Sequence, residues 1–475
     1  MQQPGKARKR RPLYRRKWLW IVVAVVAALG VCVGPWPTYS GTYEGTDYAR
    51  RTFARIAELP LAGAAGPLRA GVAVADITPP VGEPLAGLTN RKPKASDGIR
   101  DRLFAKAISL SDGHRTVTLV GGDLLLAMPS LVDAVTDRVR LPREELYFTA
   151  THTHSGPGGY SPRWLHQISL GSFDRTILDR LADAFAGVIT ESRRQMRPAE
   201  MTIGRYAGGD PNIAPYVVNR IDPNGSVHET VFAMQLHSRH NGQRRPLASF
   251  AVASPHPTCL GDASRRISGD YPGAVQRIMA ERLGCPCLFA IGATGSMDLP
   301  ERHLPPDERI RLAAERITQA SCKALDGGRS IDPQAAHVAG AILQVDLPRQ
   351  QCRISRSWRL SPILTSYAHG RQTYVHVLRI NDVVLLGMPA DYSGELAAEL
   401  ESLAESKGLL AVVTGFNGDY IGYLLPRSRY ACGHYEAGYM NLFGPWAGEY
   451  LNALGGGIIS MLARSGPTRG EMPRN

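Results

Sequence analysis

A pair of histidines separated by one residue follows a short run that is typical of a strand. Residues 147–150 are predicted as this strand, and His152 and His154 come soon after it, before a loop rich in glycine and proline. Side chains two positions apart on an extended chain share a face, so both imidazoles could point into one pocket. Neutral imidazole is a common zinc ligand. The pair alone is a weak indication, because either histidine could also be a non-ligand.

Two more polar side chains stand where predicted strands end. His256 is flanked by prolines on both sides after a predicted strand, and a purely structural histidine is the alternative. Asp391 lies between a strand predicted at 383–387 and a helix predicted at 393–405, where it could also serve only as the helix cap. Enzymes of the α/β class place their sites in loops at strand ends, which makes both residues candidates.

Tyrosines recur in the two stretches 417–426 and 433–438, which contain Tyr423 and Tyr435. Tyrosines at such positions are usually packing residues with a satisfied hydroxyl. Taken together, however, the candidates offer two imidazoles, one carboxylate and a phenol. That set makes a credible oxygen and nitrogen shell for zinc, with room for a water molecule.

Short strands alternate with amphipathic helices from residue 68 onward, which predicts an α/β or mixed α+β domain with mostly buried strands. Helices are predicted at 173–194, 273–282, 307–325, 393–405 and 449–464. Strands are predicted at 72–75, 104–110, 116–120, 147–150, 231–236, 246–253, 286–291, 336–345, 375–379, 383–387 and 410–415.

The net charge of +13 is concentrated at the N-terminus, where eight Lys and Arg residues precede residue 18 without one acidic residue. The rest of the chain is only mildly basic, so we expect no nucleic-acid binding. Residues 18–34 are apolar and uncharged, which predicts a single-pass transmembrane signal anchor with its basic end in the cytoplasm. A cleaved signal peptide, giving a secreted protein, is the alternative. Both place residues 38–475 outside the cytoplasm.

These observations divide the chain into five predicted parts. They are a basic cytoplasmic segment at 1–17, a transmembrane anchor at 18–34, a stalk at 35–67 with one short helix, a catalytic domain at 68–465 and a tail at 466–475.

Several stretches, in this order, resemble the neutral/alkaline non-lysosomal ceramidases. They are the opening run 71–80, the histidine loop 150–159, the turn 268–273 and the spaced tyrosines of 417–438. The resemblance extends from about residue 68 to about residue 464 and implies one large zinc-hydrolase domain.

The resemblance also implies roles for individual residues. The zinc ligands would be His152, His256, Asp391 and Tyr423, with Asp391 at a position where the family has the longer glutamate. The second histidine of the pair, His154, would lie beside the reacting centre.

Two further roles follow from the same resemblance. Tyr435, twelve residues after Tyr423, would contact the amide oxygen, and Arg220 is the nearest candidate for a family arginine that follows an asparagine.

One position departs from the family. Asp298 falls where the family has an essential serine, and Ser296 falls where it has an aspartate. Asp298 could take a proton from water, bind a second ion, or bind a cationic group of the substrate. It could also only fix its own loop through backbone hydrogen bonds. The departure puts ceramide itself in doubt as the substrate.

We therefore expect a zinc-dependent amide hydrolase that cleaves the N-acyl bond of a sphingolipid or similar lipid amide by attack of zinc-bound water. Two alternatives stay open: a zinc hydrolase of another N-acyl amide or of an ester, and a catalytically degenerate surface protein that binds lipid or a partner.

Overall fold

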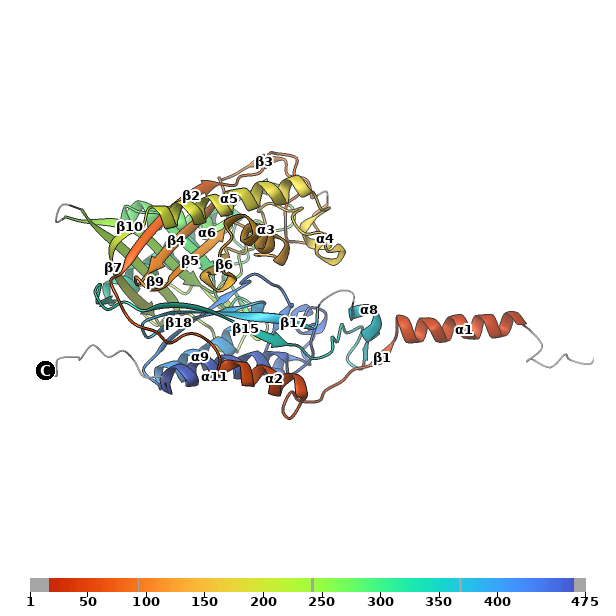
Figure 1. Ribbon diagram of the computed structural model, residues 1–475. Helices are drawn as coiled ribbons and strands as arrows, with labels where there is room; N and C mark the ends of the chain where they lie inside the picture. The colour runs from red at the N-terminus through yellow and green to blue at the C-terminus, as the bar shows by residue number, and fades with distance from the viewer. Residues whose placement is uncertain (1–16, 93, 241–242, 367–369, 465–475) are drawn as a thin grey trace, which may run out of the picture.

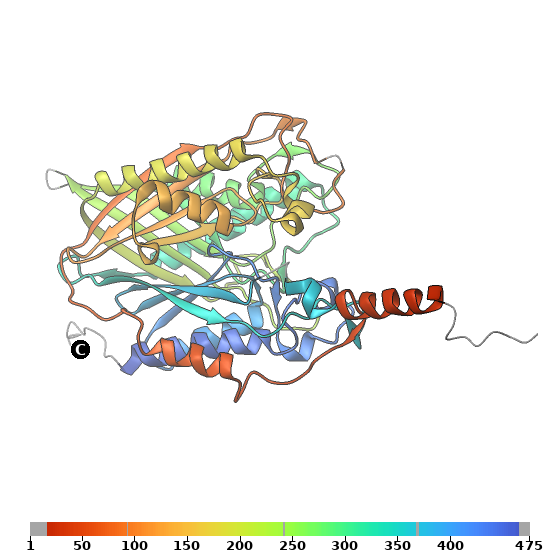
Figure 2. The same cartoon turned by 45° about the vertical axis from the view of Figure 1, so that its right-hand side comes forward.

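The computed structural model describes residues 17–92, 94–240, 243–366 and 370–464. Within them two β-sheets pack face to face, and helices cover the outer face of each sheet (Figures 1 and 2). The arrangement confirms the predicted mixed α/β class.

The larger sheet has nine strands of mixed direction. Neighbours β5–β6 and β10–β12 run parallel, and the other pairs are antiparallel. In order across the sheet the strands are β12 (Cys287–Ile291), β10 (Gln243–Ala253), β9 (Val231–His240), β7 (Arg197–Tyr206), β2 (Arg69–Asp76), β4 (Phe104–Ser111), β5 (Thr116–Gly122) and β6 (Leu146–Ala150), with β14 (Arg329–Ile331) paired to β7.

The smaller sheet has four strands, of which the last two run parallel. They are β15 (Val338–Asp346), β17 (Gln372–Ile380), β18 (Val383–Met388) and β20 (Leu410–Gly415). One buried apolar layer joins the two sheets. It includes Leu119 and Phe250 from the larger sheet and Leu378 and Leu385 from the smaller one. Strands that are buried on both faces need apolar residues at successive positions, which explains runs such as 383–388.

Seven helices account for the two outer layers. Four lie against the larger sheet: α3 (Pro129–Val139), α5 (Arg175–Arg194), α6 (Asp270–Leu283) and α7 (Pro306–Asp326). Three lie against the smaller sheet: α2 (Asp47–Ile56), α9 (Gly394–Glu405) and α11 (Ala447–Arg464). The amphipathic pattern is clear in α5, whose Ile177, Leu181 and Phe185 are spaced four apart and buried.

Short strands and helices lie in the segments that connect the longer elements. The pairs of two-residue strands are β1 (Trp36–Pro37) with β16 (Trp358–Arg359), β3 (Gly98–Ile99) with β11 (Arg266–Ile267), β8 (Val218–Asn219) with β13 (Met297–Asp298), and β19 (Asp391–Tyr392) with β21 (Tyr423–Leu424). Short helices are α4 (Trp164–Leu170), α8 (Pro362–Ser366) and α10 (Tyr435–Gly438), and single turns are η2 (Arg143–Glu145) and η3 (Arg427–Arg429).

The predicted helices and strands are confirmed, with boundaries shifted by a few residues. Two longer elements were not predicted, β7 and α3. In β7, charged side chains interrupt the alternation of apolar residues, and the strand is held by pairing with β9, β2 and β14.

The predicted stalk at 35–67 is corrected, because its helix packs on the body. The side chains of Ala49, Thr52 and Ile56 on α2 are buried against the smaller sheet and α11. Arg51 Nε also forms an ion pair with Asp346 Oδ2 at 2.9 Å. This segment is therefore part of the folded unit.

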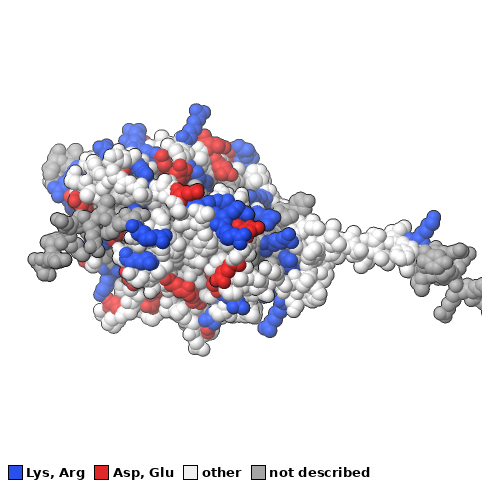
Figure 3. Space-filling model, turned by 60° about the horizontal axis from the view of Figure 1, so that its bottom comes forward, with Lys and Arg blue, Asp and Glu red and all other residues white. Residues whose placement is uncertain are grey.

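The predicted transmembrane anchor at 18–34 is not supported. The helix there, α1 (Lys17–Cys32), has 16 residues, none of them buried, and extends away from the body (Figures 1 and 3). At ~1.5 Å per residue it is about 24 Å long, less than the ~30 Å of a bilayer core. Among the described residues no helix has both the length and the apolar character that a membrane span requires. The predicted basic segment at 1–16 and the tail at 466–475 lie outside the described residues.

Candidate metal centre

Three imidazoles meet at one point inside the molecule. The Nε2 atom of His154 lies 3.3 Å from that of His152 and 3.0 Å from that of His256, and those of His152 and His256 are 3.3 Å apart. His152 and His154 follow the end of β6, and His256 follows the end of β10. The structure thus brings together three histidines from two distant segments, as the strand-end pattern predicted.

The hydrogen bonds of two of these rings leave Nε2 free to bind an ion. Nδ1 of His152 donates to the carbonyl of Leu125 at 2.9 Å, and Nδ1 of His256 lies 3.1 Å from the hydroxyl of Thr294. A proton on Nδ1 leaves a lone pair on Nε2. Burial lowers the pKa of His152 to about 3 and that of His256 well below its usual value, so both rings are neutral at pH 7.

His154 differs from the other two. Burial lowers its pKa as well, but in the described parts of the chain its Nδ1 is buried without a hydrogen-bond partner. Gly87 packs against this edge of the ring so closely that a Cβ there would lie 2.5 Å from Nδ1, and the φ of Gly87 is +83°. Only glycine fits both constraints. No acceptor therefore fixes the tautomer of His154, which suits a residue that exchanges a proton.

Asp391 places a carboxylate beside the imidazoles. Its Oδ1 lies 3.7 Å from Nε2 of His152 and, within the described chain, is buried without a hydrogen-bond partner. Its Oδ2 accepts from the hydroxyl of Tyr420 at 2.9 Å. Burial raises the pKa of Asp391 to about 7, against the opposing effects of Arg220, Tyr420 and Tyr423. The cap alternative is wrong, because Ser393 caps α9.

These residues fit a divalent metal ion. Neutral imidazoles with lone pairs facing one another, next to a buried carboxylate oxygen that has no hydrogen-bond partner in the described chain, form a set of nitrogen and oxygen donors that suits a cation. Tetrahedral zinc with Zn–N distances of ~2.0–2.1 Å places ligand nitrogens ~3.3–3.4 Å apart. The 3.3 Å between the Nε2 atoms of His152 and His256 matches that value.

Tyr423 lies next to Asp391 because β19 and β21 pair in parallel, with these two residues in register. Burial raises the pKa of Tyr423 well above its usual value. Arg220 acts in the opposite direction: its Nη2 donates to the Tyr423 hydroxyl at 2.9 Å, and its guanidinium lies 5.4 Å from the centre of the ring. A cation at the hydroxyl favours the phenolate, the form in which a tyrosine binds a metal.

Tyr435 and Glu436 complete this side of the site. The hydroxyls of Tyr435 and Tyr423 are 3.3 Å apart, and Glu436 Oε1 lies 3.3 Å from Nε of Arg220. Tyr435 is 51% exposed whereas Tyr423 is 4% exposed, so the site opens to solvent at Tyr435.

The backbone of His152 is held in an uncommon conformation. Its φ is +61°, in the left-handed region that costs a non-glycine residue roughly 1 kcal/mol. The ring stacks on Phe416, with centroids 4.0 Å apart and planes 13° apart, and Phe416 also has a positive φ, of 60°. Packing from both sheets therefore fixes the direction of this imidazole.

Asp298 makes its contacts within its own loop. Its Oδ1 accepts from the backbone N–H of Leu299 at 2.7 Å, and its Oδ2 pairs with Arg302. Among the described residues no hydrogen bond or ion pair connects it with the three imidazoles. These contacts match the loop-fixing alternative, and a catalytic role for Asp298 stays a prediction.

Sequence reasoning missed two residues of the site. Tyr420 is the first tyrosine of the stretch that supplies Tyr423, and this repetition could have indicated it. Arg91 is 1% exposed and donates to the carbonyls of His154 at 2.7 Å and Ala86 at 3.1 Å. Apart from the hydroxyl of Ser155, its partners are backbone atoms, which leave no pattern in a sequence.

Comparison with known proteins gives this site a context. Residues 68–284 match the sequence profile of the family "Neutral/alkaline non-lysosomal ceramidase, N-terminal". This part of the chain is similar to the N-terminal part of the neutral/alkaline non-lysosomal ceramidases. It contains His152, His154, Arg220 and His256, whereas Asp391, Tyr423 and Tyr435 lie beyond it in the chain.

Individual ceramidases show how far the similarity extends. The neutral ceramidase of Pseudomonas aeruginosa is 22% identical over 479 aligned positions, which cover 80% of this chain and 70% of that protein. The neutral ceramidase of Oryza sativa subsp. japonica is 27% identical over 238, which cover 47% of this chain and only 30% of the rice protein. The crystal structure of the Pseudomonas aeruginosa ceramidase superimposes with a TM-score of 0.69 at 19% identity, over 86% of this chain and 76% of that one, so the two share a fold.

Proposed function

We propose that this protein is a zinc-dependent hydrolase that cleaves the N-acyl bond of a lipid amide of the ceramide class. One observation carries the proposal: three imidazole Nε2 atoms converge beside a buried carboxylate oxygen that has no hydrogen-bond partner in the described chain, and residues 68–284 match a ceramidase family profile. The names of the similar proteins support the amide bond as the target.

His152, His256, Asp391 and Tyr423 would hold the metal. A bound zinc ion lowers the pKa of a water molecule to ~7 and polarises a carbonyl oxygen. Burial keeps the two imidazoles neutral, and Arg220 favours the ionised form of Tyr423. The two imidazoles are thus already in the form that binds a metal, whereas Asp391 and Tyr423, whose pKa values burial raises, would release protons on binding.

His154 would move the proton during the reaction. Its Nε2 faces the same point as those of the two ligand histidines, while its Nδ1 has no acceptor in the described chain. It can accept a proton as the water attacks and donate that proton to the leaving amine nitrogen. Without this donation the amine would have to leave as an anion, which is a far poorer leaving group.

Tyr435 would bind the amide oxygen. Its hydroxyl lies at the exposed end of the site, and a hydrogen bond to a developing oxyanion is worth about 3 kcal/mol in comparable enzymes. Arg220 already contacts Tyr423 and Glu436. We assign it a positioning role, in which it acts through Tyr423.

Asp298 points to a second candidate substrate for the same zinc-dependent hydrolysis. Its carboxylate stands where the family has serine, so the preferred acyl compound could be another N-acyl amide or an ester.

Purified full-length protein should be tested on ceramide, a simple N-acyl amide and a matched ester, with and without chelator. We expect amide cleavage that chelation abolishes and zinc restores. Amide cleavage that continues unchanged in the presence of a chelator would refute the proposal. A failure of zinc-loaded protein to cleave any amide would also refute it.

We also propose that residues 38–475 lie outside the cytoplasm. The support is the basic run before residue 18, followed by the apolar residues 18–34. A reporter enzyme that works only after export, fused after Asn475, should be active. A reporter that works only in the cytoplasm should be inactive there, and the reverse pattern would refute the location.

A further inference from the structure

A second cavity lies away from the metal centre, where the chain leading from α1 crosses the C-terminal part of the molecule. It has a volume of about 570 Å³, within the ~300–1,000 Å³ of small-molecule sites. Its walls come from residues within 39–51, 348–359 and 443–450, together with Arg371. It shares no lining residue with the metal centre.

Hydrogen bonds fix the wall that the N-terminal segment provides. The side-chain amide of Gln351 accepts from the N–H of Tyr39 at 2.7 Å and donates to its carbonyl at 2.6 Å. The indole N–H of Trp446 donates to the carbonyl of Ser40 at 3.0 Å. The cavity is thus a built part of the fold.

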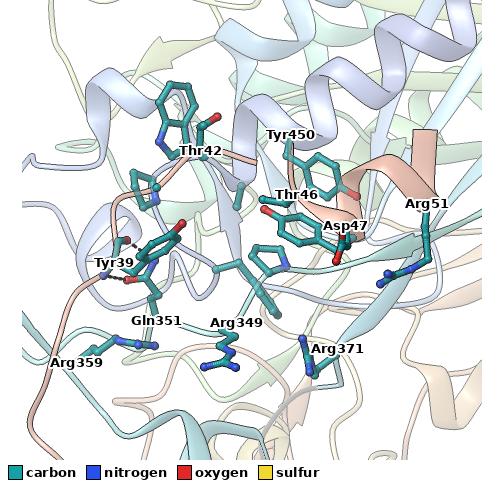
Figure 4. A pocket seen from close by; sticks show the side chains of 17 residues that line it. Tyr39, Thr42, Thr46, Asp47, Arg51, Arg349, Gln351, Arg359, Arg371 and Tyr450 are labelled. Atoms are coloured by element: carbon teal, nitrogen blue, oxygen red, sulfur yellow. Dashed lines mark hydrogen bonds between the residues drawn. The ribbon is translucent and has the colours of Figure 1, made fainter. Parts of the chain in front are cut away.

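Positive charge dominates this cavity. Arg51, Arg349, Arg359 and Arg371 line it, against one acidic residue, Asp47. In Figure 4 the side chains of Arg349, Arg359 and Arg371 lie along one side of the cavity, and Tyr450 and Thr42 lie on the other. Figure 3 shows basic side chains gathered on the part of the body nearest to α1.

Three of these arginines are not neutralised. Arg51 is paired with Asp346, whereas Arg349, Arg359 and Arg371 form no ion pair with any residue that the structure describes. Arg359 is only 7% exposed, and its two hydrogen bonds go to backbone carbonyls, those of Pro37 and Gln350. Burial and the neighbouring charge of Arg349 lower the pKa of Arg359. The buried charge of Arg359, which no acidic residue of the described chain neutralises, and the neighbouring exposed charges of Arg349 and Arg371 favour an anion within the cavity.

The remaining walls are aromatic. Tyr39, Tyr48, Phe443, Trp446 and Tyr450 face the cavity, and Tyr48 and Tyr450 pack edge to face at 5.4 Å. Guanidinium groups bind phosphate through paired N–H donors, and aromatic rings bind apolar or ring-shaped groups. The cavity therefore matches a ligand with a phosphate at one end and an apolar group at the other.

We propose that this cavity is a binding site for a phosphate ester, with Arg349, Arg359 and Arg371 holding the phosphate and the aromatic walls holding the group attached to it. Two sources share this chemistry, a soluble phosphate ester and the headgroup of a phospholipid. The site is independent of the proposed hydrolase activity.

The test uses the purified full-length protein with two probes, phenyl phosphate and vesicles of phosphatidylcholine with or without phosphatidic acid. Calorimetry measures the first, and co-sedimentation measures the second. The test variant is Arg349→Gln/Arg371→Gln, which removes two exposed, unpaired charges. The matched control is Arg245→Gln/Arg282→Gln, which removes the same charge from exposed positions on β10 and α6. Circular dichroism checks that both variants fold.

We expect the test variant to bind about ten-fold more weakly or worse than wild type, and the control to bind like wild type. Binding of phenyl phosphate with this dependence supports a soluble ester as ligand. Binding of phosphatidic acid vesicles alone, with the same dependence, supports a lipid headgroup. If neither probe binds wild-type protein, or if test variant and control bind equally well, the proposal is wrong.

Discussion

Asp391 and Tyr423 are register partners in the parallel pair β19–β21, so a carboxylate and a phenol from separate segments lie side by side at the imidazole cluster. Asp391 follows β18 and Tyr423 follows β20, and these two strands also run parallel in the smaller sheet. The smaller sheet thus positions the carboxylate and the phenol, and the larger sheet positions the histidines. The metal centre lies where the two sheets meet.

The pKa of Asp391 leads to a pH-dependent stability. Its folded value of about 7 exceeds its ordinary value of 3.8, so between these pH values the folded carboxyl keeps a proton that the unfolded chain releases. The free energy of unfolding of metal-free protein should therefore fall as pH rises through this range, by up to about 1.4 kcal/mol per pH unit from this group.

Asp391→Asn isolates this effect, because the lowered pKa values of the histidines contribute to both proteins. Urea unfolding of metal-free wild type and Asp391→Asn at several pH values between 4 and 8 measures the difference. We expect the advantage of wild type over the variant to shrink as pH rises. Parallel stability curves would show that Asp391 is ionised throughout.

Arg220 should act through Tyr423. Arg220→Gln removes the cation at the phenol and should weaken metal binding by about ten-fold, the lower end of the range for a residue that supports a metal ligand. The phenol absorbance, titrated with pH in the presence of metal, should show Tyr423 ionising at higher pH. Arg302→Gln, which removes an arginine that pairs with Asp298, is the control and should leave metal affinity unchanged. Equal metal affinity in Arg220→Gln and wild type would exclude the positioning role.

His154 is expected to move protons and not to bind the metal. His154→Ala should lower kcat by about 100-fold or more, the usual range for a lost acid or base, while the metal content stays the same. Metal analysis and kinetics on the same preparation separate the two roles. Loss of metal in this variant would instead make His154 a ligand, which its 3.0 Å approach to Nε2 of His256 also permits sterically.

The contacts of Asp298 make a structural role testable against a catalytic one. Asp298→Asn keeps an oxygen that can accept from Leu299 N–H but loses the charge. If the residue only fixes its loop, turnover on whichever of the three test compounds the protein cleaves should stay within a few-fold of wild type, while Asp298→Ala should lower the melting temperature. A loss of about 100-fold in kcat for Asp298→Asn, with metal retained, would restore the general-base role.

The fold could be predicted to a large extent because the apolar residues of its long helices and strands follow a regular spacing. Residues 383–388 form a continuous apolar strand, residues 116–120 are rich in β-branched side chains, and α5 has a regular apolar stripe. The packing of α2 could not be predicted, since the ion pair of Arg51 with Asp346 joins segments far apart in the sequence.

The site was predictable only where its residues belong to recognisable motifs. The histidine pair, His256 and the tyrosine stretch have such motifs, and the structure brings them together. The two-residue pairs β8–β13 and β19–β21, which set the places of Arg220, Asp391 and Tyr423, are too short to show any period. The contacts of Arg91 and Asp298 with backbone atoms likewise depend on the folded chain alone.

The most direct test of the metal centre is elemental analysis of purified protein, paired with the His152→Ala/His256→Ala variant. His114→Ala/His237→Ala is the control, because it removes the same two ring types away from the cluster. We predict one zinc ion per chain in wild type and control, and none in the test variant. A metal content that stays unchanged when His152 and His256 are replaced would contradict the account.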